Sequence, residues 1–409
     1  MIIKRFSVAL MFAGILLLSN LAVNAWDDTG HKITAYIAWQ RMTPEVREKV
    51  LRILLEAPED SQINAFYMPY GSQNVDARKR DYFMFMATWA DVIRDRNFTN
   101  RYKYHKSNWH YSDSFWTVKD GKIEALSAPE DGGQALERIA EYVTLIKGTA
   151  TDSQKALAIA WLEHLVGDIH QPLHSSARVT ETEPKGDQGG NLFFLTPKGT
   201  PRDKQENLHW FWDSIVVRNI PNTKDECDID FLEPLAKSFM KKYPFDKMES
   251  RLALSDYAAW AKESLTFAQN DVFSSDLKRF EFPSDKYKKK ALEVAEERLA
   301  LAGYRMGEIF NQAFGTPAAT PNFVSSTDGV PCKIIRKVMY PVTQTSSVKQ
   351  TLEIGLLDLC PTHIAARPMM GFMVGGKMIM KEYDVVKTFK SEAEARKYAA
   401  DNKITDVSL

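Results

Sequence analysis

The sequence lacks the cysteine content of a disulfide scaffold. Its 409 residues include only three cysteines, Cys227, Cys332 and Cys360, whereas small secreted domains held together by disulfides contain far more in proportion. An oxidising compartment would permit one bridge, and Cys332 with Cys360 is the preferred pair because both lie in the same terminal segment. Three buried free thiols are an equally good interpretation.

An excess of charge of either sign is also missing. Lys and Arg together number 53, and Asp and Glu together number 53. A protein that grips long duplexes by neutralising many phosphates is normally basic, so this balance argues against that class. It leaves open an enzyme that captures one or two phosphates with metal ions.

Beyond the N-terminus no apolar run is long enough to span a bilayer. Lys4 and Arg5, the apolar stretch over residues 6–18 and the small-residue ending at Ala25 follow the order of a secretory signal. The stretch is too short for a membrane anchor. We therefore expect a signal peptide at residues 1–25, a mature chain that begins at Trp26, and a secreted or periplasmic protein without stable insertion into a membrane.

Hydrophobic periodicity divides the rest of the chain into two parts. Apolar residues return every three or four positions from Trp26 to about Phe314, which predicts a mainly α domain over residues 26–314. A proline-punctuated linker is expected at residues 315–322, and residues 323–409 favour a small α+β module to which no role or protein partner is assigned. Helices are predicted over residues 44–55, 76–93, 133–146, 153–169, 207–218, 230–242, 255–273, 285–314 and 391–401, a hairpin over 186–195, and strands over 333–342, 350–359 and 369–388.

A cluster of histidines and aspartates carries the strongest chemical signal. His164 and Asp168 lie four positions apart near the end of a predicted helix, so they share a face and can bind one metal ion. Pro172 should end that helix and let His174 turn back towards the same pocket. His209 and Asp213 repeat the spacing of four. Mixed imidazole and carboxylate ligands suit zinc better than calcium.

A single pair of this kind is more often a hydrogen-bonded pair on a helix than a metal site. The combination favours the metal site, because the chain has only eight histidines. Five of these histidines lie in compact aromatic or acidic contexts: His31, His110, His164, His174 and His209.

Together these motifs resemble the zinc-dependent single-strand nucleases of the S-one/P-one (type I) family. The resemblance covers nearly all of residues 26–314, and the joint order and spacing of its pieces is highly specific. The matching pieces are Trp26-x4-His31, Trp89-Ala-Asp91, Trp109-His110-Tyr111, His164-x3-Asp168-x-His170-Gln-Pro-Leu-His174, Gly186-Asp-Gln-Gly-Gly-Asn191 and Asn207-Leu-His209-x3-Asp213.

The resemblance implies a multi-helix fold shared with zinc-dependent phospholipase C and a site for three zinc ions. It implies that His105, His170 and His363 have no metal role. It assigns the first ion to Asp91, His110, His164 and Asp168, the second to His174, His209 and Asp213, and the third to Trp26, His31 and Asp168. Trp26 would contribute its free α-amino nitrogen and its carbonyl oxygen, so removal of the signal peptide would complete the site.

The implied activity is hydrolysis of single-stranded DNA and RNA to 5′-phosphorylated nucleotides by a metal-bridging hydroxide. A second expected activity is that of a 3′-nucleotidase. Asp91 would orient the nucleophile, Asp168 would bridge two ions, and Arg94 would assist the departing oxygen. Asp113, Gly190 and Asn191 are the expected substrate-binding residues. For Asp113 a surface carboxylate, and for the glycine loop an ordinary tight turn, are equally good interpretations.

Two other functions remain open from the sequence. A zinc-dependent phospholipase C has a similar fold and ligand set, although its last ligand pair usually ends in glutamate rather than in an aspartate such as Asp213. A non-catalytic zinc-binding adhesion protein would use the histidines only to hold helices together. Asp27 and Asp28 depart from the family pattern, in which a small residue is commoner after the tryptophan.

Overall fold

The computed structural model describes residues 26–67, 75–128, 132–222, 228–315, 332–341, 349–355, 370–374, 377–389 and 401. The predicted signal peptide lies outside these residues, as do Cys227, Cys360, His363 and all but the last residue of the helix predicted over 391–401. The cysteine pairing and the signal cleavage therefore stay predictions.

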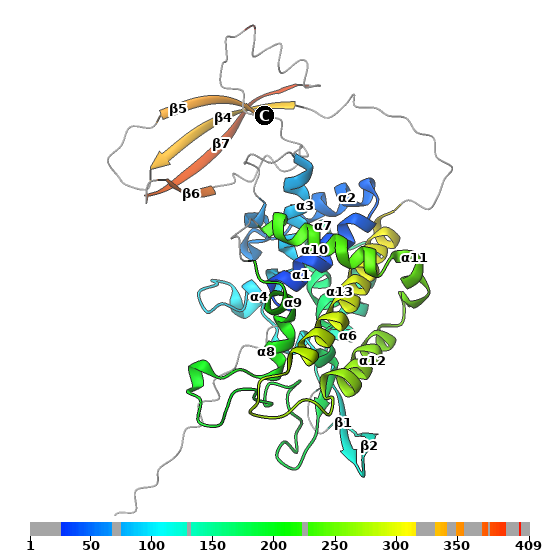
Figure 1. Ribbon diagram of the computed structural model, residues 1–409. Coiled ribbons are helices and arrows are strands. Elements are labelled where there is room, and N and C mark those ends of the chain that lie inside the picture. The colour runs from blue at the N-terminus through cyan, green and yellow to red at the C-terminus, as the bar shows by residue number, and fades with distance from the viewer. Residues whose placement is uncertain are drawn as a thin grey trace, which may run out of the picture.

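The described part of residues 26–315 consists mainly of helices (Figure 1), which confirms the predicted fold class. The longest element, α13, forms over the predicted residues, whereas α1 was not foreseen. In chain order the α-helices are α1 (Asp28–Arg41), α2 (Pro44–Leu54), α3 (Val75–Met86), α4 (Trp89–Val92), α5 (Arg101–Tyr104), α6 (Ala135–Lys147), α7 (Asp152–Asp168), α8 (Leu208–Asp213), α9 (Ile215–Asn219), α10 (Asp228–Lys242), α11 (Phe245–Met248), α12 (Tyr257–Phe267) and α13 (Asp285–Phe314).

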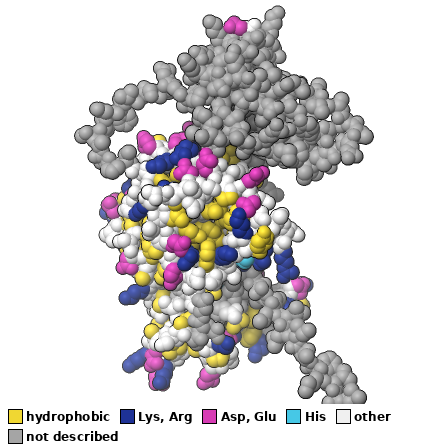
Figure 2. Space-filling view, turned by 180° about the vertical axis from the view of Figure 1, so that it is seen from behind, with side chains coloured by type: hydrophobic (Ala, Val, Ile, Leu, Met, Phe, Trp, Pro, Cys, Tyr) yellow, Lys and Arg dark blue, Asp and Glu magenta, His cyan; other side chains and the backbone are white. Residues whose placement is uncertain are grey.

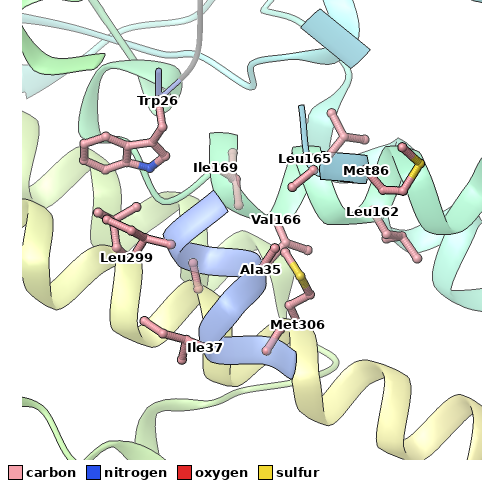
Figure 3. Close-up of a cluster of buried hydrophobic side chains, with 14 of the residues drawn as sticks. Trp26, Ala35, Ile37, Met86, Leu162, Leu165, Val166, Ile169, Leu299 and Met306 are labelled. Atoms are coloured by element: carbon pink, nitrogen blue, oxygen red, sulfur yellow. The ribbon is translucent and has the colours of Figure 1, made fainter. Parts of the chain in front are cut away.

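Helix α1 occupies the centre of the domain, against both α7 and α13 (Figure 3). Its residues from Gly30 to Trp39 are all buried. Two glycines of α13 allow the close approach, since a Cβ on Gly303 would lie 2.5 Å from the Cβ of Ile37 and one on Gly307 would lie 2.7 Å from the Cβ of Arg41. A helix that is buried on every side has no polar stripe, so hydrophobic periodicity does not reveal it.

Local capping explains where α2 and α7 begin. The Thr43 side chain accepts a hydrogen bond from the Val46 amide, and Pro44 occupies the first turn of α2, as predicted. Thr151 and Gln154 form a reciprocal capping box at the start of α7. Helix α7 ends at Asp168, before Pro172, and a short 3-10 helix (η4, Pro172–Ser175) follows.

Two predicted helices are each broken into two. Over residues 76–93, α3 and α4 are separated because the Thr88 hydroxyl donates to the Phe85 carbonyl while the Ala87 carbonyl accepts from His164. Over residues 207–218, α8 and α9 are separated at Ser214, whose hydroxyl donates to the Trp210 carbonyl. Side chains that bond to nearby carbonyls compete with the helical pattern.

The helix predicted over residues 255–273 forms over a shorter span. The side chain of Asp256 caps α12, which begins at Tyr257. The chain then continues past Phe267 as a π-helical turn (η7, Ala268–Val272).

A small sheet has the strand order β2-β1-β3, formed by β1 (Ser114–Lys119), β2 (Lys122–Ala125) and β3 (Ser176–Arg178). Strands β1 and β2 form a hairpin through Asp120 and Gly121, both at positive φ, which is the typical signature of a tight hairpin turn. The hairpin predicted over residues 186–195 is wrong. That segment is a series of turns with one isolated bridge, from Phe194 to Asn207.

A second, antiparallel sheet lies in the C-terminal part of the chain. Its order is β5-β4-β7-β6, from β4 (Cys332–Pro341), β5 (Lys349–Gly355), β6 (Met370–Val374) and β7 (Lys377–Phe389). These strands overlap the three predicted strand regions, and the third of them contains two strands rather than one. In the described part of the chain no helix combines the length and the apolar character needed to cross a membrane.

Candidate metal centre

Asp168, the last residue of α7, lies at the centre of a buried group of three imidazoles. Its carboxylate oxygens are 3.3 Å from His31 Nε2, 3.2 Å from His164 Nε2 and 3.1 Å from His110 Nδ1. The His31 ring is stacked on that of His164 with centroids 4.0 Å apart. Gly167 leaves the space for the His31 ring, because a Cβ there would lie 2.8 Å from His31 Nδ1.

Asp91 lies at the more accessible edge of this group. Its carboxylate is 3.9 Å from His164 Nε2, and it accepts a hydrogen bond of 2.8 Å from Arg94. The break between α3 and α4 contributes to this arrangement, since the freed Ala87 carbonyl lies 2.8 Å from His164 Nδ1. The same turn of chain therefore presents Asp91 and fixes the orientation of His164.

His174, His209 and Asp213 form a second buried group. His174 comes from η4, directly after α7, and the other two residues come from one face of α8. His209 Nε2 is 3.5 Å from Asp213 Oδ2, and the ring centroids of His174 and His209 are 4.8 Å apart. Gln171 donates to Asp213 Oδ1 at 2.7 Å, which leaves Oδ2 without a hydrogen-bond partner.

Backbone carbonyls determine which nitrogen each histidine presents. The Nδ1 atoms of His164, His174 and His209 lie 2.8, 2.6 and 2.7 Å from the carbonyl oxygens of residues 87, 110 and 189. A carbonyl can only accept, so in the neutral rings Nδ1 carries the proton and Nε2 presents a lone pair. Metal-binding imidazoles are oriented in this manner.

The side chains of the centre offer a set of donors suitable for metal ions. Within each of three groups, ligand atoms lie within 4.8 Å of one another: His31 with His164 and Asp168, Asp91 with His110 and His164, and His174 with His209 and Asp213. Several atoms at the centre are buried and have no hydrogen-bond partner, among them His110 Nε2, His174 Nε2 and Asp213 Oδ2. Such atoms are costly in a folded protein unless a ligand satisfies them, and nitrogen with carboxylate oxygen is a donor set that zinc accepts.

Burial and neighbouring charges shift the ionisation of the cluster in opposite directions. Burial lowers the pKa of His31, His110 and His174, which favours the neutral imidazole that can bind metal. Burial would raise the pKa of Asp168, but the surrounding imidazoles hold it well below its usual range. In the second group, burial raises the pKa of Asp213 well above its usual range. The charged neighbours that raise it further are other carboxylates, Asp27, Asp91 and Asp168.

Trp26, the proposed third-site residue, is buried at the start of the domain. The next residue, Asp27, donates its amide to the Asp213 carbonyl at 2.9 Å and accepts from the Gly30 amide at the start of α1. The chain therefore passes the second group immediately before α1 carries His31 to Asp168. The geometry places the beginning of the predicted mature chain beside the centre.

The predicted substrate-binding residues lie on the β1 side and in the loop before α8. Asp113 Oδ1 is buried without a partner, and burial together with Asp187 raises the pKa of Asp113 well above its usual range. The Asn191 side chain is already used within the loop, because its amide donates to the Gln188 carbonyl and its oxygen accepts from Asn207. Gly190 has φ +81°, and a Cβ there would press on Leu173 at 3.3 Å. The loop is thus held internally, and base recognition by Asn191 stays a prediction.

Three residues of the centre were not singled out from the sequence: Gly167, Gln171 and Asp187. Gln171 lies within the quoted motif, so its proximity to His174 was a signal. Its contact with Asp213, 42 positions away, depends on the fold. Conversely, His170 bonds to the Val166 carbonyl and to Arg305, away from the cluster. His170 is in none of the three groups of candidate ligands, and its lack of a metal role stays a prediction.

Comparison with known proteins gives the same result as the motifs. Nuclease S1 of Aspergillus oryzae is 23% identical over 69% of this chain and 89% of its own. Endonuclease 1 of Arabidopsis thaliana is 24% identical over 75% of this chain and 92% of its own. Nuclease P1 of Penicillium citrinum is 24% identical over 48% of this chain and 59% of its own. Since the family profile described as S1/P1 Nuclease matches residues 26–315, the chain belongs to the S1/P1 nuclease family.

Proposed function

We propose that this chain is an exported, zinc-dependent nuclease that hydrolyses phosphodiester bonds of single-stranded DNA and RNA to 5′-phosphorylated nucleotides. The observation that carries the proposal is the convergence of imidazole and carboxylate atoms around Asp168 and Asp213, with several of those atoms buried and unpartnered. A site of this kind in a member of a nuclease family is best explained by metal-assisted phosphodiester hydrolysis.

The proposed zinc ligands are the side chains of the two buried groups, with Trp26 at the third position. Zinc bound there would polarise a phosphate oxygen and make a water molecule more acidic. The ligand set is Trp26, His31, Asp91, His110, His164, Asp168, His174, His209 and Asp213.

The chain's own residues orient the ligands and the substrate. The carbonyls of residues 87, 110 and 189 hold three imidazoles with Nε2 inwards, and Gln171 holds the Asp213 carboxylate. Arg94 is fixed by Asp91 at the accessible edge, where a planar guanidinium can bind a phosphate with further N–H groups. Asp91 accepts the hydrogen bond from Arg94 and thereby holds this guanidinium at the edge of the centre.

Removal of the predicted signal peptide is proposed to complete the site. A free α-amino group has a pKa of about 7.7 to 8, so a metal ion can displace its proton near neutrality. An amide nitrogen in a chain that continues before Trp26 cannot serve as the same ligand. A protein with one extra residue before Trp26 should therefore bind less zinc and lose activity, whereas full activity in such a protein would refute this part of the proposal.

The principal test combines zinc quantification with activity on a defined substrate. Correctly processed protein should contain about three zinc ions per chain and cleave a single-stranded oligonucleotide faster than the matched duplex. His174→Ala should lose zinc and activity, and His363→Ala serves as a matched control outside the described residues. Cleavage of phosphatidylcholine without nucleotide release would instead identify a phospholipase. One tightly bound zinc without any hydrolysis would indicate a structural or adhesion role.

A further inference from the structure

Residues 94–106, which we call the rim loop, form a basic surface segment between α4 and the His110 region. The loop contains one acidic residue, Asp95, whose carboxylate accepts from the Asn97 amide at 2.7 Å. The whole chain is balanced in charge, so this segment differs in its local composition. Its basic residues are Arg94, Arg96, Arg101, Lys103 and Lys106.

The rim loop has a defined structure because two of its aromatic residues are anchored in the domain. Phe98 and Tyr104 are 9% and 6% exposed. The Tyr104 hydroxyl donates to the Asp60 carboxylate at 2.6 Å, and the Asn100 amide donates to the Asp60 carbonyl at 2.8 Å. The remaining side chains of the loop are therefore presented from a fixed backbone.

Both ends of the rim loop contact the metal centre. At one end Arg94 bonds to Asp91, and Arg101 Nε donates to the Arg94 carbonyl at 2.8 Å. At the other end, the centroids of the His105 and His110 rings are 6.5 Å apart. A strand whose phosphate reaches the centre past Asp91 would thus pass directly over the loop.

Tyr102 is the most exposed large hydrophobic side chain of this segment, with 81% of its surface accessible. It lies in the single turn of α5, where residues two positions apart point to opposite sides. Tyr104 therefore points into the domain and Tyr102 points to solvent. An exposed ring on a fixed backbone is a platform on which any base can stack.

The cations beside Tyr102 are not all neutralised. Lys103 is paired with Asp60 at 2.6 Å, whereas Arg96 and Lys106 form no ion pair with any other residue that the structure describes. Arg96 is exposed and Lys106 is half-buried. Figure 2 is turned by 180° from Figure 1, so the side of the domain on which α4 lies is at the right in Figure 2, where Lys and Arg side chains are visible at the edge.

We propose that the rim loop is a binding surface for the part of the single strand that extends beyond the phosphate being cleaved. Tyr102 stacks on a base, while Arg96 and Lys106 contact backbone phosphates. The surface recognises flexible strands through stacking and charge, without reading the base sequence. This inference rests on the proposed nuclease function and adds a subsite that would make cleavage dependent on the length of the substrate.

The test compares a long and a short substrate with the processed, zinc-loaded full chain. We would measure kcat/KM for a 12-nucleotide oligothymidylate and for the thymidine dinucleotide. Tyr102→Ala should lower the ratio of the two values about tenfold, because stacking on one ring contributes that much per base. Tyr102→Phe retains the ring and should restore the wild-type ratio.

The charge contribution has a separate readout. We would plot log KM for the 12-mer against the logarithm of the salt concentration. The double variant Arg96→Ala/Lys106→Ala should reduce the slope of this plot by about 1.4, because each lost phosphate contact on a single strand contributes roughly 0.7. The matched control is Lys119→Ala/Lys122→Ala in the β1–β2 hairpin, which removes two exposed cations elsewhere and should leave this slope unchanged.

The outcomes separate this inference from the proposed function. If the wild-type protein cleaves neither substrate, the proposed function fails. If the wild type cleaves both and Tyr102→Ala keeps the wild-type ratio, only the rim-loop surface is refuted, and a contact with another protein would explain the exposed tyrosine. An equal loss on both substrates, accompanied by loss of zinc, would also contradict the inference because it would show damage to the metal centre.

Discussion

Two clusters of buried polar residues meet near the end of α7, and they differ in how well their hydrogen bonds are satisfied. On one side, His164 and Asp168 face the metal centre, where several ligand atoms have no protein partner. On the other side, His170 faces Arg298 and Arg305 of α13, which are both fully buried and both bound to the Glu263 carboxylate, at 2.7 and 2.9 Å.

In the second cluster, the two arginines are hydrogen-bonded to side chains and to backbone carbonyls. Arg298 donates to the His170 carbonyl and to Ser264, and Arg305 donates to His170 Nε2 and to the carbonyls of Leu252 and Arg251. Buried ions with complete hydrogen bonding maintain a fold, whereas buried donors and acceptors that converge on one point without partners are available to bind a ligand. The same residue types therefore have different roles, and the hydrogen-bond inventory distinguishes them.

The largest effect is expected from a substitution at the candidate metal centre. Asp168→Asn keeps the size of the side chain but removes the charge shared by two proposed ions. We expect activity on a single-stranded oligonucleotide to fall about 1,000-fold or more, with reduced zinc content and an unchanged far-UV circular dichroism spectrum. The control is Asp246→Asn, at an exposed position. Near-wild-type activity in Asp168→Asn would remove the basis for the proposed site.

A smaller effect is expected from a substitution in the arginine cluster. Glu263→Gln leaves Arg298 and Arg305 buried without a counter-charge, and we expect the free energy of unfolding to fall by about 3 kcal/mol. Chemical denaturation would measure this loss, and Glu281→Gln, in an exposed pair 3.8 Å from Lys278, should change stability by less than about 0.5 kcal/mol. Zinc content per folded molecule should stay at the wild-type value. Loss of zinc at unchanged stability would reverse the roles assigned to the two clusters.

A smaller effect is expected from the residue that supports a proposed ligand without being one. Gln171→Leu removes the hydrogen bond to Asp213 Oδ1, and zinc affinity or activity should fall about 10- to 100-fold. Competition with a zinc chelator would measure the affinity. Gln205→Leu, at an exposed position, is the control. A change confined to stability would place Gln171 with the structural cluster instead.

The smallest effect is a change with pH in the contribution of Glu263 to stability. Burial raises the pKa of Glu263, but the two arginines outweigh it and hold that pKa below the ordinary value of 4.5. The stabilisation by Glu263 is therefore complete above about pH 4.5 and is lost as pH falls through its lower value in the folded protein. The stability difference between wild type and Glu263→Gln should shrink below pH 4.5. A difference that grows on acidification would contradict this assignment.

The sequence alone predicted those parts of the molecule that depend on neighbouring residues. The four-residue spacing of His164 and Asp168 places both on one face of α7, and the Thr43 and Pro44 signals locate the start of α2. The Asp120-Gly121 turn was also readable from the sequence, although it was not predicted.

Other features depend on contacts between distant segments. Helix α1 has no polar stripe because it is buried on all sides, and the break before α4 depends on a carbonyl that bonds to a histidine 77 positions away. The partnering of Gln171 with Asp213 and of His170 with Arg305 likewise follows from tertiary packing. Spacing could identify which residues belong to the centre, but not which of their atoms are satisfied.

The contact between α1 and α13 has a consequence for the order of folding. The first helix of the domain packs against its last, through glycines that admit no spacing side chain, and this contact joins residues 28–41 to residues 285–314. A chain that emerges N-terminus first from a ribosome or a translocation pore cannot close this core until its final helix has emerged. Earlier segments must wait with apolar surfaces uncovered, so the domain should fold late, as a unit, and depend on protection from aggregation until α13 arrives.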